Sequence, residues 1–283
     1  MIDINRIPRE ELGKDCPIEL RVCDTEVDMY WRVAIDVLET IVENNEKGEP
    51  TLMVVPYGPV GPYSRIAYLV NKYRISLKNC TFINMDEYLT DDKKYIDKND
   101  PLSFRGGMER AFYGLVDDEL NVLPENRYFP DPENPGKVME LIEKFGKLDM
   151  VFGGVGINGH YAFNEPPEDG EEVTNEEFLN RPTRVLEVSR ETRTINSYMN
   201  CYGDLNAIPK YCITVGMKEM FMAKKVRMCM PRDWNSGALR KVLHGEMTAK
   251  VPCSLFRLHK NAALYAATDA LKSPVPEIRI YNK

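Results

Sequence analysis

The sequence has few of the residue types and motifs that many functional sites require. Its 283 residues include only three histidines and two tryptophans. The seven cysteines stand singly without a C-x-x-C pair, so no cysteine–histidine cluster has the spacing of a metal site. A Walker phosphate loop and a lysine signal for pyridoxal phosphate are also absent, and the run Gly153-Gly154-Val155-Gly156 is not interpreted as a dinucleotide fingerprint. We therefore expect a site that holds no metal and requires no cofactor.

Long apolar runs are absent as well. No stretch approaches the length of a membrane span, and Met1 to Arg6 lack the apolar core of a signal peptide. The odd number of cysteines, several inside apolar runs, is typical of buried free thiols in a reducing compartment. These features predict a cytoplasmic protein that has no membrane partner.

The overall composition is that of a soluble globular chain. Hydrophobic residues make up 43% and charged residues 29%, and the length suffices for one large domain with a sizeable core. The net charge of -7 argues against a nucleic-acid partner. It does not exclude a local basic pocket for an anionic small molecule.

Short apolar segments alternate with amphipathic ones along the chain. This alternation predicts an α/β fold with a doubly wound, mostly parallel Rossmann-like sheet flanked by helices. Residues 1–17 are predicted to be an N-terminal extension and residues 18–283 a single domain. The expected strands are Ile18–Val22, Thr51–Val55, Cys80–Asn84, Leu148–Phe152, Val226–Met230 and Ala262–Ala266.

One stretch combines a strand end, a glycine turn and polar side chains. Open α/β sheets bind ligands at such strand ends. His160 is a candidate proton shuttle near neutral pH, and Glu165 is close enough in sequence to orient it. The alternative is that His160 only packs in a loop and Glu165 is solvated. The stretch follows Phe152 and contains Gly153, Gly154, Gly156, Asn158, Gly159, His160, Asn164 and Glu165.

Four motifs in order resemble the glucosamine-6-phosphate deaminase family. The first is Gly-x-Gly-x-Asn-Gly-His-x-x-Phe-Asn-Glu-Pro, which ends at Pro166. The others are Phe82–Tyr88, the region from Thr183 to Ser197, and Pro209–Gly216. The resemblance extends from about residue 50 to residue 268 and implies a lid at about 183–210.

The resemblance implies aldose–ketose chemistry on an amino sugar. His160, oriented by Glu165, would protonate the ring oxygen and open the sugar. Asn158, also expected to belong to the catalytic set, stands where many family members have an aspartate that supports the histidine. Asp86 would then move a proton from C2 to C1, and the resulting imine would lose ammonia. The family requires no cofactor for this. The other two histidines of the chain, His244 and His259, are predicted to be structural.

The resemblance also implies a set of substrate-binding positions. Family members bind phosphate at a loop that here reads Pro56–Pro62, with three prolines that lack N–H donors. They use an arginine where this chain has Tyr198 and a lysine where it has Asn235. Either other arginines (Arg65, Arg193 or Arg232) replace these groups, or the substrate carries no phosphate at that carbon or carries a different anionic group. The predicted substrate-binding residues are Gly58, Gly61, Glu87, Gly156, Gly159, Arg193, Tyr198 and Asn235.

Two other functions stay open at this point. A sugar-lactone hydrolase of the 6-phosphogluconolactonase type has a similar glycine–histidine turn and would release no ammonia. A non-catalytic sugar-binding protein would bind the sugar without turnover. The partner in every case is a small sugar or sugar phosphate, and the sequence leaves a homo-oligomer open.

Overall fold

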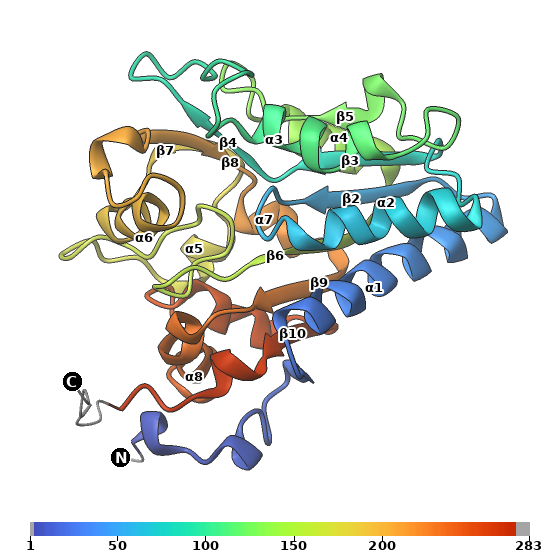
Figure 1. Ribbon diagram of the computed structural model, residues 1–283. Coiled ribbons are helices and arrows are strands. Elements are labelled where there is room, and N and C mark those ends of the chain that lie inside the picture. Colours follow the sequence, from blue (N-terminus) through green and yellow to red (C-terminus); the bar gives the residue numbers. More distant parts are fainter. Residues whose placement is uncertain (1–2, 276–283) are drawn as a thin grey trace, which may run out of the picture.

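A seven-stranded sheet forms the centre of the computed structural model, which describes residues 3–275 (Figure 1). All its strand pairs are parallel, in the order β1-β10-β9-β6-β2-β3-β5. The predicted doubly wound sheet is therefore confirmed. Its strands are β1 (Glu19–Cys23), β2 (Thr51–Val55), β3 (Cys80–Asn84), β5 (Arg127–Tyr128), β6 (Leu148–Gly154), β9 (Ala223–Met230) and β10 (Ala262–Ala267).

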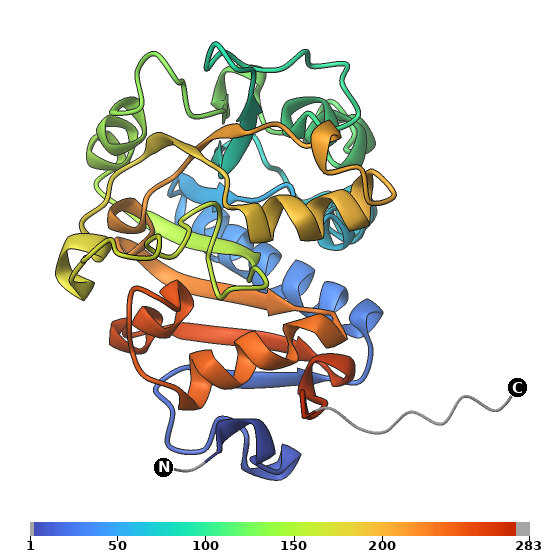
Figure 2. The same cartoon turned by 90° about the vertical axis from the view of Figure 1, so that its left-hand side faces the viewer.

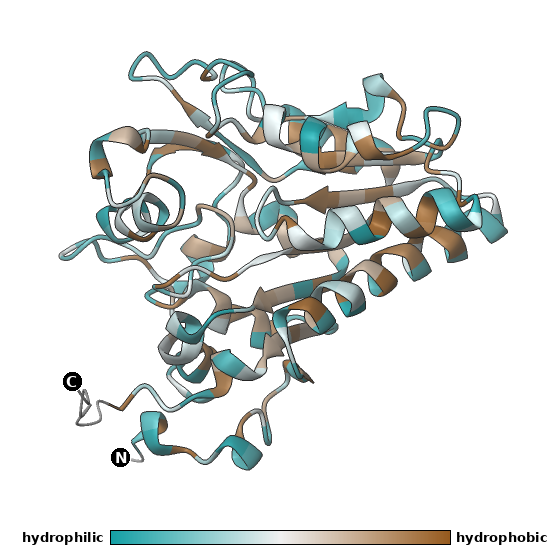
Figure 3. Ribbon diagram, viewed as in Figure 1, coloured by the Kyte–Doolittle hydropathy of each residue, from teal (hydrophilic) through white to brown (hydrophobic). Residues whose placement is uncertain are grey.

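Helices cover both faces of the sheet, and the central strands β2 and β3 are buried along their whole length. Met53 and Val55 pack among residues of one group of helices, and Leu52 and Val54 pack on the opposite face. The apolar colouring of Figure 3 accordingly follows the strands. The first face carries α1 (Glu26–Lys47), α2 (Gly61–Tyr73) and α3 (Phe104–Ala111), and the second carries α4 (Lys137–Phe145), α5 (Asn175–Leu179), α7 (Met217–Met220) and α8 (Ser236–His244).

A second, three-stranded antiparallel sheet was not predicted. Its order is β4-β8-β7, from β4 (Asp86–Leu89), β8 (Tyr211–Thr214) and β7 (Arg184–Glu187). The helix α6 (Arg190–Asn200) follows β7. Figures 1 and 2 show α6 beside the end of the large sheet toward which its strands point. Residues 86–89 pair with a segment more than a hundred residues away, so local pattern alone does not reveal β4.

The N-terminal segment packs against α8 and the last elements of the chain. It contains two short 3-10 turns, Ile4–Arg6 and Arg9–Glu11, and the buried Leu12. The backbone N–H of Gly13 donates to Nε2 of His244 at 3.0 Å, which confirms a structural role for that histidine. Hollows of about 530 and 360 Å³ border this segment. None of the predicted site residues lines either hollow.

No helix between residues 3 and 275 is long and apolar enough to cross a membrane.

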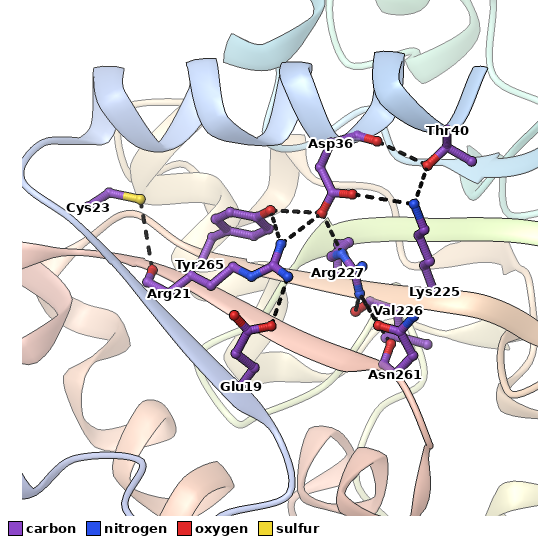
Figure 4. A network of polar contacts seen from close by, with 10 residues as sticks. All are labelled: Glu19, Arg21, Cys23, Asp36, Thr40, Lys225, Val226, Arg227, Asn261 and Tyr265. Carbon is purple, nitrogen blue, oxygen red and sulfur yellow. Dashed lines mark hydrogen bonds and ion pairs between the residues drawn. The ribbon is translucent and has the colours of Figure 1, made fainter. Parts of the chain in front are cut away.

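A buried ionic network ties α1 to three strands (Figure 4). The carboxylate of Asp36 accepts hydrogen bonds from Arg227 Nε at 2.5 Å, Arg21 Nη1 at 3.0 Å and the Tyr265 hydroxyl at 2.7 Å. Burial opposes the charge of Asp36, but the guanidinium of Arg227 and these hydrogen bonds outweigh it, so the pKa of the carboxyl is lowered. Removing the carboxylate would leave two partly buried cations without their anion.

We expect Asp36→Ala to lower the free energy of unfolding by about 3–5 kcal/mol, because breaking a buried ion pair leaves uncompensated charge. Denaturant titration measures this change. Glu39→Ala removes an exposed carboxylate from the same helix and should change stability by less than about 0.5 kcal/mol. Equal effects of the two substitutions would contradict a structural role for the network.

His244 makes the stability of the fold dependent on pH. Its Nε2 accepts a hydrogen bond, so it must be unprotonated in the folded state. Burial, and then the charges of Arg257 and Arg240, lower the pKa of His244. The folded state therefore binds this proton less readily than the unfolded chain, whose histidines titrate near pH 6.5.

The stabilising contribution of His244 should be complete above about pH 6.5 and should decrease as the pH falls through that value toward the lower folded pKa. His244→Gln, which cannot titrate, should lose less stability than the wild type between pH 7 and pH 5. Thermal melts at the two pH values measure the difference. A parallel loss in both proteins would show that His244 does not control this pH dependence.

Candidate active site

The turn after β6 is closed by its own backbone. The N–H of Gly156 donates to the carbonyl of His160 at 3.0 Å, and the N–H of Gly159 donates back to the carbonyl of Gly156 at 3.0 Å. A Cβ at position 156 would lie 2.1 Å from the imidazole of His160, so only glycine lets the ring lie there. Gly159 has φ +85°, which glycine adopts without strain. Both glycines thus shape the histidine turn, and their predicted contact with substrate stays a prediction.

Three side chains meet at one nitrogen of His160. The Nδ1 atom lies 2.8 Å from Asn158 Oδ1, 3.1 Å from Glu165 Oε2 and 3.2 Å from Thr192 Oγ1. Asn158 also donates its Nδ2 to Glu165 Oε2 at 2.9 Å. The amide orientation leaves Asn158 Oδ1 and the carboxylate as acceptors, so Nδ1 must carry the proton in the neutral ring. The Nε2 atom is then the basic nitrogen left for chemistry.

Glu165 is held as a buried anion. Burial opposes its ionisation, but the charge of His160 and hydrogen bonds from His160, Asn158 and Thr192 outweigh that effect and lower its pKa to about 2. The side chain is 8% exposed, and its Oε1 has no hydrogen-bond partner among the described residues. The predicted histidine–carboxylate pair is present, and the alternative of a solvated Glu165 is wrong.

Asp86 has the opposite electrostatic character. It begins β4, it is 7% exposed, and no hydrogen bond to its carboxylate is found among residues 3–275. Burial, together with the neighbouring charge of Glu87, raises the pKa of Asp86 to about 8. A carboxylate that is poorly solvated and holds its proton up to neutral pH has the properties of a general acid–base group.

Thr214 joins the Asp86 strand to the histidine turn. It is the register partner of Asp86 in the β4–β8 pair, and its Oγ1 accepts the N–H of Phe163 at 3.1 Å. The ring of Phe163 lies 5.5 Å from that of Tyr88 and 6.4 Å from that of His160, measured between centroids. Asp86 and His160 therefore belong to segments that pack directly against each other.

Two predicted substrate-binding residues belong to the scaffold instead. Glu87 has no exposed surface, and both its oxygens accept hydrogen bonds at the start of α3, from Ser103 Oγ and the backbone N–H groups of Phe104 and Arg105. A carboxylate there offsets the positive end of the helix. Asn235 is also fully buried and bonds to the backbone of Val155 and Arg232. Sequence position alone did not show that their polar atoms were already satisfied.

The segment that leads from β2 into α2 contains three prolines, Pro56, Pro59 and Pro62, which lack an N–H donor. A cis peptide joins Gly58 to Pro59, and the carbonyl of Gly58 accepts the N–H of Gly154 at 3.3 Å. Gly61 begins α2, and a Cβ there would overlap the ring of Tyr30. Gly61 thus has a structural reason to be glycine, whereas a Cβ at position 58 would meet no atom within 4 Å. Contact of either glycine with a substrate stays untested.

The predicted substitute arginines all have protein partners. Arg193 donates Nη2 to the carbonyls of Leu205 and Ile208 at 3.3 and 3.4 Å. Arg65 donates to the carbonyl of Gly61 at 2.8 Å, and Arg232 pairs with Glu26 at 3.0 Å. By contrast, the side chain of Tyr198 on α6 is largely exposed. No cation cluster comparable to a dedicated phosphate pocket is formed by these residues.

Sequence reasoning missed three contributors to the site. Thr192 contacts His160, Thr214 links the segments that contain Asp86 and His160, and Asn196 donates to the hydroxyl of Tyr88 at 2.9 Å. All three lie inside the family motifs, so their positions were a signal, but their partners are distant in sequence. In residues 3–275 no group of three or more His, Cys, Asp or Glu side chains is arranged to hold a metal ion.

Curated relatives are similar in sequence to this chain over most of its length. The glucosamine-6-phosphate deaminase of Yersinia enterocolitica is 30% identical over 221 residues, which cover 76% of this chain and 77% of the relative. That of Mycoplasma mycoides is 27% identical over 215 residues, which cover 75% and 80% of the two chains. No protein-family model matches the chain.

Solved structures agree on the fold. A monomeric glucosamine-6-phosphate deaminase superposes with a TM-score of 0.76 at 23% identity, covering 89% of this chain and 98% of the other. A 6-phosphogluconolactonase from Thermotoga maritima reaches a TM-score of 0.63 at 12% identity, covering 89% and 100%. At these identities both establish the architecture alone. The 30% identity to the Yersinia enzyme over three quarters of both chains decides the family: this chain belongs to the glucosamine-6-phosphate deaminase family.

Proposed function

We propose that this protein is an amino-sugar phosphate isomerase and deaminase that converts glucosamine-6-phosphate, or a related hexosamine, to the ketose and ammonia. The observation that carries the proposal is the pairing of two groups with opposite properties. His160 is held by the ionised Glu165, and Asp86 lies on the adjoining segment with its pKa raised to about 8. Environments that shift the pKa values of two titratable groups in opposite directions are typical of acid–base sites.

His160 opens the sugar ring in this proposal. Its Nδ1–H is engaged by Asn158 and Glu165, so Nε2 exchanges the proton with the ring oxygen. The buried negative charge of Glu165 stabilises the imidazolium that donates this proton. The C1 hydroxyl gives up its proton to water as the C1–O5 bond breaks, and the product is the open-chain aldehyde.

Asp86 then moves a proton along the carbon chain. As a carboxylate it abstracts the proton from C2 while the C1 oxygen takes up a proton from water, which leaves an enolamine. As a carboxylic acid it then returns the proton to C1, and the amino nitrogen gives up a proton to water as the C2 imine forms. The C2 imine that results adds water and releases ammonia, leaving a carbonyl at C2. Neither an oxidant nor a reductant is needed, because the aldose–ketose step only relocates hydrogen within the substrate.

A phosphate group on the substrate would meet arginines that already have protein partners. Positively charged side chains near the loop after β2 are engaged by Glu26 or by backbone carbonyls. A charge-assisted hydrogen bond contributes about 1.5–3 kcal/mol, so losing several would select against a phosphate group. We therefore propose the amino-sugar chemistry first and treat phosphorylated glucosamine as its reference substrate.

Ammonia release from a panel of free and phosphorylated hexosamines tests this function. We expect release from glucosamine-6-phosphate and a loss of at least about 100-fold in kcat for Asp86→Asn and for His160→Gln. If ammonia is released only from an unphosphorylated hexosamine, the proposed reaction stands and the proposed substrate is wrong. Acid release from 6-phosphogluconolactone without ammonia from any hexosamine would replace the proposal with a lactonase.

The raised pKa of Asp86 predicts how stability and activity depend on pH. A carboxyl with a raised folded pKa binds its proton more tightly in the folded than in the unfolded state, so its ionisation destabilises the fold between about pH 4 and pH 8. Asp86→Asn should therefore be more stable than the wild type by several kcal/mol at pH 8, and the difference should vanish near pH 4.

Thermal melts at both pH values measure this difference, and Asp92→Asn is the exposed control for the loss of one charge. In kinetics, the base form of Asp86 should make kcat/KM rise with pH up to about 8. A destabilised Asp86→Asn protein at pH 8 would show that the carboxylate is solvated or paired in solution.

A further inference from the structure

The helix α6 brings the hydroxyl of Thr192 to the Nδ1 atom of His160. Ser189 caps the helix and accepts the N–H of Thr192 at 3.2 Å, which fixes Thr192 in the first turn. Thr192 is 1% exposed, and its Oγ1 lies 3.2 Å from Nδ1 of His160. A buried hydroxyl at this position needs a hydrogen-bond partner, and the catalytic pair provides it.

The same face of α6 also contacts the Asp86 strand. Asn196 lies one helical turn after Thr192 and donates its Nδ2 to the hydroxyl of Tyr88 at 2.9 Å. Tyr88 follows Asp86 by two residues in β4. Through these two side chains α6 bridges the segments that carry the two proposed catalytic groups. Thr194, between them, is exposed and bonds only to the backbone of Arg190.

The donors and acceptors around Nδ1 of His160 determine which hydrogen bonds the hydroxyl of Thr192 can make. Nδ1 has one proton, and Asn158 Oδ1 and Glu165 Oε2 both accept it. A threonine hydroxyl can accept and donate at once, unlike either of these groups. Its own proton is therefore free for the carboxylate, and a hydrogen bond from Thr192 contributes to the low pKa of Glu165.

We infer that Thr192 is a positioning residue that couples the seating of α6 to the orientation of the His160–Glu165 pair. Its hydroxyl contributes to the stabilisation of the Glu165 carboxylate and holds His160 in the Nδ1–H tautomer while α6 covers the site. The expected effect of Thr192 on turnover rests on the proposed function. Its expected effect on the pKa of Glu165 is independent of that function.

The first test is independent of activity. In ¹³C NMR of the glutamate carboxyl groups, with the Glu165 signal assigned from Glu165→Gln, Thr192→Val should move the titration midpoint of Glu165 to higher pH. Thr192→Ser retains the hydroxyl, and Thr194→Val removes one from the exposed face, so both should titrate like the wild type. An unchanged midpoint in Thr192→Val overturns the inference even if no hexosamine is turned over. If Thr192→Val does not fold, Thr192→Ala provides the same comparison.

The second test uses ammonia release. We expect Thr192→Val to lower kcat about tenfold with KM unchanged, because the hydroxyl acts through His160 and not on the substrate. Thr192→Ser and Thr194→Val should stay within about twofold of the wild type. In a Glu165→Gln background the Thr192→Val effect should fall below about twofold, since the two groups act together. Equal losses in both backgrounds, or equal losses for Val and Ser, would show a packing role and overturn the inference.

Discussion

The parallel direction of the seven strands is the constraint on which the rest of the structure depends. Parallel strands need crossover helices on both faces, so both faces are buried and only the strand ends remain for polar chemistry. β2, β3 and β6 end at the same edge, followed by the loop at Gly58, the segment of Asp86 and the turn of His160. The small antiparallel sheet and α6 then pack over this edge and bring Thr214 and Thr192 to it.

Buried charge is treated in three ways in this fold, and each treatment has a different result. Asp36 is surrounded by cations and a tyrosine, and it ties α1 to the sheet. Glu165 is ionised because His160, Asn158 and Thr192 all stabilise its charge. Asp86 is buried beside another carboxylate without such partners, so it retains its proton near neutral pH. Partners such as those of Asp36 would stabilise the fold at any buried carboxylate. Asp86, the residue proposed to move a proton, lacks them.

Much of the architecture was predictable because its signals are local. Thr51–Val55 and Cys80–Asn84 were predicted with the bounds that the structure has, and Thr25 caps α1 in a capping box with Asp28. The element β4 was missed, since Asp86–Leu89 becomes a strand only by pairing with Tyr211–Thr214. Glu87 and Asn235 were assigned to substrate for a related reason. A sequence names a polar side chain but does not say which backbone groups already satisfy it.

The sequence by itself determined the fold class, the family motifs and the residues of the histidine turn, because hydrophobic periodicity and glycine positions are written along the chain. Only the tertiary structure decided which polar side chains are already bonded within the protein and which remain at the candidate site. It turned Glu87 toward the start of α3, placed Asn235 under Val155, and engaged Arg65 and Arg232 with partners of their own. It also brought Thr192 to His160 across 32 positions. Hydrogen-bond partners and desolvation are properties of the folded environment, so residue identity does not fix them.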